Sequence, residues 1–130
     1  MRWSELVEAV RERGEYPTTK EAERITKIVL STLGGHLAGT AKANLVKRLP
    51  AEAATVIAEQ VPVIQPLTGA QFVDSVAARL DGATPTTARW DVSSVLSVVA
   101  DAAGDELTER IICLLPPGYA LLFGRVQLAA

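Results

Sequence analysis

The residues able to do chemistry are few, and they do not combine into a reactive site. His36 is the only histidine and Cys113 the only cysteine of the 130 residues. A Ser-His-Asp triad or a zinc site needs a histidine beside a nucleophile or further ligands, so this pair supplies at most half of one. We therefore expect His36 to be a polar residue near a helix end. Cys113, inside the apolar run Ile111–Leu115, is expected to be a small buried side chain.

One acidic segment resembles a cation site only in composition. Its carboxylates are those of Asp101, Asp105, Glu106 and Glu109. They lack the alternating spacing of oxygen ligands in a calcium loop, and Gly104 followed by Asp105 is typical of one helix ending and another beginning. The sequence thus predicts no catalytic residue, no metal site and no cofactor, and it favours a protein that is not an enzyme.

Basic residues of two predicted helices form the next candidate, a modest nucleic-acid-binding patch. They are Lys20, Arg24, Lys27, Lys42, Lys47 and Arg48. Glu21 and Glu23 dilute this charge, and no aromatic side chains lie between the cations to stack on bases. The net charge of the chain is −2, without the basic excess that binding to a phosphate backbone usually requires. A solvated charged face is the favoured interpretation, and nucleic-acid binding is the alternative.

The elements that would position these residues are predicted to be helices. Hydrophobic residues make up 48% of the chain and aromatic residues 5%, so the core must consist mainly of aliphatic side chains. Trp3, Leu6, Val7 and Val10 have the i, i+3, i+4, i+7 spacing of one helix face, and similar stripes recur along the chain. No segment shows a convincing alternation of polar and apolar residues. The pattern indicates an all-α fold.

The chain divides at an apolar connector, residues 61–67. Its two prolines, Pro62 and Pro66, exclude a helix, and its apolar side chains predict that it packs against the body of the protein. Four helices are expected before it and four after it. Thr68 and Gln71 form a capping box at the start of the second series. The eighth helix is expected to hold Tyr119, Leu122 and Phe123.

The second series repeats the first at an offset of 66 positions. The identical pairs include Ala22 and Ala88, Val29 and Val95, Leu30 and Leu96, Ser31 and Ser97, and Leu49-Pro50 and Leu115-Pro116. Proline at the same place in both halves marks the same helix boundary twice. We predict a single domain over residues 1–130, with repeat one at about 2–60, the connector 61–67, repeat two at about 68–124 and a short tail at 125–130. The fold would be two pseudo-symmetric four-helix repeats packed together, with Leu49 and Leu115 buried in equivalent places.

These repeated features also resemble a known family. Three features occur twice between Trp3 and Phe123: an aromatic-led first helix, the pattern A-x(6)-V-L, and a capped helix ending in Leu-Pro. In these features the chain resembles the bacterial family called domain of unknown function 2267. The resemblance implies a helical fold and a bacterial origin. It implies no activity, and no functional residues can be carried over from it.

Trp90 is the best candidate for a partner-binding residue. It stands where the repeat offset places Arg24 in the first half, and a position that is charged in one half and an indole in the other is expected at a surface or an interface. On its helix it lies about 200° from Val92, at or beyond the edge of the apolar stripe. We expect its indole either to cover the connector, which we favour, or to bind another chain.

Function is predicted only in outline. The favoured hypothesis is a non-catalytic helical module that binds an unidentified protein or self-associates. A nucleic-acid-binding domain is the first alternative. An enzyme is the second, and it would need a pocket between the repeats with ionisable residues from both halves.

Compartment follows from three sequence features. The lone cysteine fits a reducing compartment. Glu5 is atypical of a signal peptide. The uncharged stretch Ile111–Gly124 is too short to span a bilayer. We expect a cytoplasmic protein without membrane contact.

Overall fold

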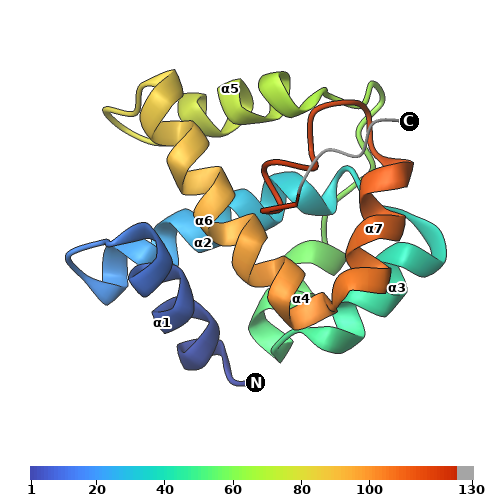
Figure 1. Cartoon of the computed structure of the whole chain (residues 1–130), viewed down its shortest axis with the longest axis horizontal. Coiled ribbons are helices and arrows are strands. Elements are labelled where there is room, and N and C mark those ends of the chain that lie inside the picture. The colour runs from blue at the N-terminus through green and yellow to red at the C-terminus, as the bar shows by residue number, and fades with distance from the viewer. Residues whose placement is uncertain (126–130) are drawn as a thin grey trace.

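The computed structural model describes residues 1–125, and these form helices and no strands, as predicted (Figure 1). The helices are α1 (Trp3–Gly14), α2 (Thr19–Gly34), α3 (Gly39–Arg48), α4 (Ala51–Ala58), α5 (Gly69–Arg79), α6 (Pro85–Ala103) and α7 (Asp105–Leu114). Within this part of the chain, none of the helices is long and apolar enough to cross a membrane.

Helix α6 is the centre of the structure, because it packs against α1, α2, α5 and α7. Its valine and leucine residues at helical spacing form the core-facing stripe, and small side chains on its other sides let neighbouring helices approach closely. Ser94 and Ser97 are buried among them, and the Ser94 hydroxyl donates to the Trp90 carbonyl at 2.8 Å. The stripe consists of Val92, Val95, Leu96 and Val99, all buried.

Helix α2 lies across α6 and supplies the opposite side of the same core. Its buried face includes Ile25, Val29 and Leu33, and the one buried hydroxyl, that of Thr26, donates to the Ala22 carbonyl at 2.7 Å. Helices α3 and α4 extend this core at one end. Each half thus buries its apolar faces partly against the other half.

The Leu-Pro landmarks lie in the core as predicted. Leu49 and Leu115 are each 8% exposed, and each directly follows a helix, α3 and α7 respectively. The proline after each leucine prevents the helix from continuing. The starts of α1, α2 and α3 at Trp3, Thr19 and Gly39 precede those of α5, α6 and α7 at Gly69, Pro85 and Asp105 by 66 positions each.

The expected eighth helix is absent from the described residues. Residues 120–124 instead form turns, and Tyr119, Leu122 and Phe123, which were expected on that helix, are buried. Gly118 and Gly124 have φ values of 100° and 75°, a backbone conformation that breaks a helix, and they leave only five residues between them. That is too short for a stable helix. Of the predicted tail 125–130, residues 126–130 lie outside the described residues.

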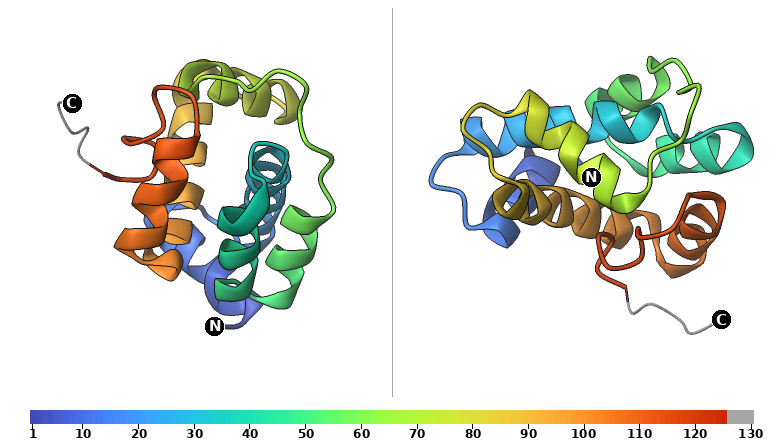
Figure 2. Two further views of the ribbon diagram at one scale, coloured as in Figure 1. Left: turned by 90° about the vertical axis from the view of Figure 1, so that its right-hand side faces the viewer. Right: turned by 90° about the horizontal axis from the view of Figure 1, so that it is seen from above.

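The connector is held by its backbone and not by its side chains. It runs along one side of the molecule from the end of α4 to the start of α5 (Figure 2). The Val63 N–H donates to the Gly35 carbonyl at 2.9 Å, but Val61 is 82% and Ile64 103% exposed. The expectation that the apolar side chains of the connector pack against the body was therefore wrong for Val61 and Ile64, whereas Leu67 is half-buried.

Candidate functional site

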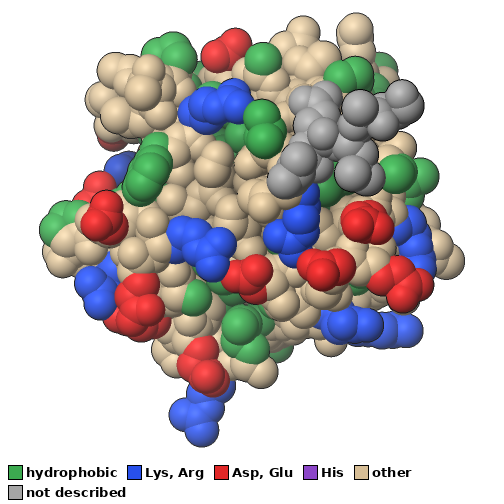
Figure 3. All heavy atoms as spheres, viewed as in Figure 1, with side chains coloured by type: hydrophobic (Ala, Val, Ile, Leu, Met, Phe, Trp, Pro, Cys, Tyr) green, Lys and Arg blue, Asp and Glu red, His purple; other side chains and the backbone are tan. Residues whose placement is uncertain are grey.

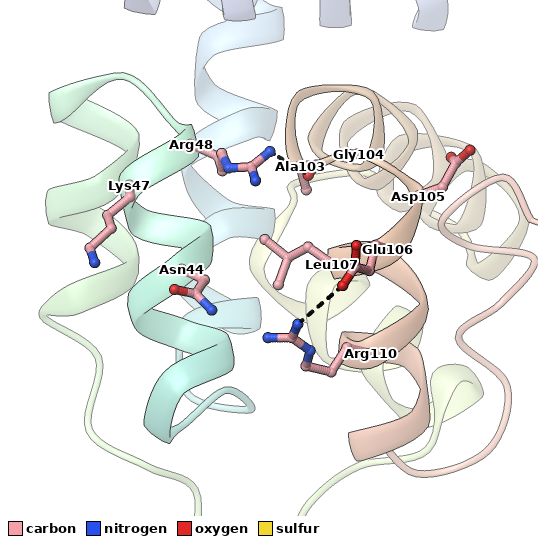
Figure 4. A pocket seen from close by; sticks show the side chains of 9 residues that line it. All are labelled: Asn44, Lys47, Arg48, Ala103, Gly104, Asp105, Glu106, Leu107 and Arg110. Carbon is pink, nitrogen blue, oxygen red and sulfur yellow. Dashed lines mark hydrogen bonds and ion pairs between the residues drawn. The ribbon is translucent and has the colours of Figure 1, made fainter.

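A polar pocket lies between α3 and α7, and its lining comes from both halves of the chain (Figure 4). Its volume is about 540 Å³. Gly104, with a φ of 87°, reverses the chain between α6 and α7 and so brings the first turns of α7 next to α3. The lining residues are Asn44, Lys47, Arg48, Ala103, Gly104, Asp105, Glu106, Leu107 and Arg110.

The charged groups of this pocket are largely engaged within it. Arg48 donates from Nη1 to the Ala103 carbonyl at 3.0 Å, at the open C-terminal end of α6. Arg110 Nη2 lies 3.8 Å from Glu106 Oε1, and Asp105 pairs with Arg125 at 2.9 Å. In Figure 4, Lys47 points away from the pocket. The Arg48 bond ties α3 to the end of α6, while the ion pair of Arg110 with Glu106 stays within α7.

This pocket has the ionisable residues from both halves that the enzyme hypothesis requires. Its ionisable groups are guanidinium, ammonium and carboxylate groups, without a hydroxyl, thiol or imidazole nucleophile beside a base. Among the described residues, no group of three histidine, cysteine, aspartate or glutamate side chains is placed to hold a metal ion. The arrangement can bind polar groups, but we assign no reaction to it.

A second surface, which we call the α7-end groove, is apolar. It has a volume of about 570 Å³ and is lined by Ile112, Cys113, Leu115, Pro116, Pro117, Tyr119 and Ala120, with Glu109 and Arg125 among its charged residues. Leu114 and Leu121, which directly follow two of the lining residues, are 68% and 55% exposed.

Cys113 belongs to this groove and is exposed, so the prediction that it is buried was wrong. The buried face of α7 is set by Leu107 and Ile111, one turn apart. Cys113 follows Ile111 by two positions, which places it about 200° around the helix. The uniformly apolar run hides this difference between faces from a reading of the sequence.

Trp90 lies beside the end of α1 and not over the connector. Its Nε1 donates to the Gly14 carbonyl at 3.0 Å, while 52% of the residue remains exposed. The favoured expectation that Trp90 covers the connector was therefore wrong. The indole ties α6 to the turn after α1 and still presents an apolar face to solvent. Binding of another chain by this face stays a prediction.

Next to Trp90, a tyrosine and an aspartate form a partly buried polar pair. The Tyr16 hydroxyl donates to Asp91 Oδ1 at 2.6 Å. Burial raises the pKa of Asp91 above its ordinary value, and the Tyr16 hydrogen bond opposes this shift only in part. Burial, followed by the bond to Asp91, raises the pKa of Tyr16 far above its ordinary value, so this phenol stays a donor.

His36 is at the end of α2, as expected, with both ring nitrogens in use. Nδ1 is 3.0 Å from the Thr32 carbonyl oxygen, and the Leu67 N–H donates to Nε2 at 3.1 Å. The ring also meets the edge of Phe72 at a centroid distance of 5.5 Å. The histidine therefore joins α2 to the connector and to α5.

The six predicted nucleic-acid-binding residues fall into two groups at different ends of the molecule. Lys20, Arg24 and Lys27 are exposed on the first half of α2, and the other three are on α3, which lies away from them in Figures 1 and 2. The structure does not bring these two groups together.

Three of these six cations are also engaged locally. Lys27 lies 3.5 Å from Glu23, Lys42 donates to the Gln60 carbonyl at 3.3 Å, and Arg48 is bound in the polar pocket. On the face shown in Figure 3, acidic and basic side chains are interspersed. Nucleic-acid binding stays a prediction, which a salt titration of binding to DNA or RNA would test.

Sequence reasoning missed Asn44 and Arg110 of the polar pocket and the pair Tyr16 and Asp91. A signal existed for three of them at the repeat offset. Asn44 and Arg110 are 66 positions apart, and Asp91 matches Ile25, so a carboxylate stands where the other half has a core residue. Tyr16 carried no comparable signal.

Comparison with known proteins gives a family but no activity. A family model described as "Uncharacterized conserved protein (DUF2267)" matches residues 3–122. A search of curated proteins finds no match.

Proposed function

We propose that this chain, which belongs to the DUF2267 family, is a non-catalytic helical module that binds a partner protein through the α7-end groove. The observation that carries the proposal is the exposure of Leu114 and Leu121 beside an apolar groove of about 570 Å³. Exposed leucines next to such a groove are typical of sites that bind an apolar protein segment.

The groove favours the apolar face of an amphipathic helix as its occupant. Its lining is aliphatic, proline and tyrosine, and the charges of Glu109 and Arg125 suit a polar rim. A helix would place apolar side chains at i, i+3 and i+4 into such a groove. Full burial of Leu114 and Leu121 would contribute about 1.5–3 kcal/mol for each side chain.

The test compares the same substitution, an exposed aliphatic residue to aspartate, at two positions: one beside the groove and one on the connector. Partners are captured with the full chain, purified, and titrated against the wild type, Leu114→Asp and Ile64→Asp. Ile64 is the matched control, because it is fully exposed on the connector and is not one of the residues that line the groove. We expect Leu114→Asp to weaken binding at least tenfold and Ile64→Asp to leave it within twofold. Equal affinities of the wild type and Leu114→Asp would contradict the proposal.

Trp90 is the second candidate contact, supported by its half-exposed indole. Aromatic anchors of this kind contribute strongly to protein interfaces. Trp90→Ala in the same titration assigns the partner to one surface or the other. A reduced affinity for Trp90→Ala alone would move the binding site from the groove to the junction of α1 and α6.

An internal duplication is the favoured origin of the fold. Three successive helix starts recur at an offset of 66 positions, and both Leu-Pro pairs follow the third helix of their half. Helix α4 has turns as its counterpart, so the proposed repeats share three helices. The free thiol of Cys113 supports a reducing compartment, and we propose the cytoplasm.

A further inference from the structure

His36 accepts a hydrogen bond from Leu67, the last residue of the connector, and it can do so only when the ring is neutral. The Thr32 carbonyl can only accept, so Nδ1, 3.0 Å away, carries the ring proton. The Leu67 N–H can only donate, so Nε2, 3.1 Å away, carries none. Only the neutral ring with its proton on Nδ1 makes both hydrogen bonds.

Leu67 is held from the opposite side by the C-terminal turn. The Tyr119 hydroxyl donates to the Leu67 carbonyl at 2.8 Å. The rings of His36 and Tyr119 both meet Phe72 at centroid distances of 5.5 Å. Two positions later, the Gly69 N–H donates to the Pro117 carbonyl at 2.9 Å. This junction therefore joins α2, α5 and the C-terminal turn.

We propose that His36 is a proton-operated latch, and that protonating its ring releases Leu67 and loosens the connector from α2. The added proton converts Nε2 from an acceptor into a donor. Two donors, Nε2–H and the Leu67 N–H, then face each other, and the ring or the connector must move. The bond between Val63 and Gly35 involves no titrating group, so the release is confined to the end of the connector.

The surroundings of the ring offer the added charge no compensating anion. Within the described residues His36 has no ion pair. On α5, Arg79 donates to the hydroxyls of Ser31 and Thr32, at 2.7 Å and 3.1 Å, so a cation contacts the side chain of the residue whose carbonyl His36 uses.

The remaining charged residues on α3 and α5 do not supply a compensating anion either. Lys42 of α3 is a second cation, bound to the Gln60 carbonyl. Asp74 of α5 is exposed and lies about 200° around the helix from Phe72. Burial raises the pKa of Tyr119, so its hydroxyl stays a donor to the Leu67 carbonyl.

The test follows the ring and the Leu67 amide together in the full chain by NMR, from pH 8 towards acid. At neutral pH we expect ring nitrogen shifts of the Nδ1–H tautomer. As the ring protonates, the protection factor of the Leu67 amide should fall about fivefold or more, the factor expected for one lost hydrogen bond. The Val63 amide is the internal control and should keep its protection.

His36→Gln is the matched variant, because its side-chain amide both donates and accepts but does not titrate. The Leu67 protection factor of this variant should not respond to pH. Three results for the wild type would overturn the latch: an Nε2–H tautomer at neutral pH, Leu67 protection that is unchanged when the ring protonates, or a ring that stays neutral until all amides lose protection together.

Discussion

Tyr16 in the turn between α1 and α2 donates a 2.6 Å hydrogen bond to Asp91 in α6, 75 positions away. Next to it, Trp90 donates to the Gly14 carbonyl. Two consecutive residues of α6 thus hold the turn that reverses the chain between the first two helices. A Cβ atom at Gly14 would overlap the Tyr16 ring, so a side chain there would displace the ring that bonds to Asp91.

The Asp91 carboxyl should make stability depend on pH in an unusual direction. Burial raises its pKa in the folded state, so the folded chain binds the proton more tightly than the unfolded chain. Its contribution is therefore fully present below the ordinary aspartate pKa of about 3.9 and is lost as the pH rises through the raised value. Asp91→Asn removes this loss. We expect the variant to gain stability relative to the wild type between about pH 4 and pH 7, measured by urea unfolding.

Tyr16→Phe is the companion variant for this prediction. It removes the donor that partly offsets the burial of the carboxylate, so its cost should be larger at pH 7 than at pH 4. If Asp91→Asn instead lost stability relative to the wild type as the pH rises, the ionised carboxylate would be stabilising and the assignment would be wrong.

Local signals in the sequence predicted helices and buried positions well. The Thr68–Gln71 capping box forms as predicted, because both of its hydrogen bonds are made within one turn. Leu49 and Leu115 are buried as predicted, each directly before the proline that stops its helix. In the C-terminal turn, Tyr119, Leu122 and Phe123 are buried, but the helix predicted to carry them is prevented by the glycines on both sides.

Features that depend on packing between distant segments could not be predicted. The polar pocket exists because α3 and α7 lie side by side, which no local pattern encodes. The connector is apolar and yet exposed, because its backbone hydrogen bonds to Gly35 and His36 hold it in place without side-chain burial. The position of the Trp90 indole could not be predicted either, because its hydrogen-bond partner, the Gly14 carbonyl, belongs to another helix.

Gly69 should not tolerate a side chain, although it is at the start of a helix. A Cβ atom there would lie 2.3 Å from the Gly118 carbonyl oxygen, and backbone atoms cannot move aside as a flexible side chain can. We expect Gly69→Ala to destabilise the fold by about 1–3 kcal/mol, as overpacking does. Ala70→Gly, at the exposed next position, should cost only about 1 kcal/mol or less. Equal costs in denaturant unfolding would show that the two backbones separate freely.

Trp90 should contribute to stability through its indole N–H as well as through its ring. Trp90→Phe keeps an aromatic side chain but leaves the Gly14 carbonyl without this donor, so we expect a loss of about 0.5–1.5 kcal/mol. Trp90→Ala should lose more, because the ring contact is also removed. Thermal unfolding of both variants measures the contribution of the N–H hydrogen bond and that of the ring contact. If neither variant shifts the transition, the indole makes no stabilising contact with α1.

The two halves should fold only together. The first half packs α1 and α2 against α6, and α3 against α7, so residues 1–66 alone would expose the apolar faces that these helices bury in the intact chain. Helix α2, whose Val29, Leu30 and Leu33 are fully buried in the full structure, packs against both α5 and α6 of the second half. A unit of about 60 residues with a shared core is marginal even when its own core is complete.

We expect residues 1–66 and 67–130, expressed separately, to show no sharp thermal transition by circular dichroism. Mixing the two fragments should restore helical signal and a cooperative transition, because the cross-half contacts are then available. A dispersed NMR spectrum and a sharp transition for residues 1–66 alone would contradict the shared core.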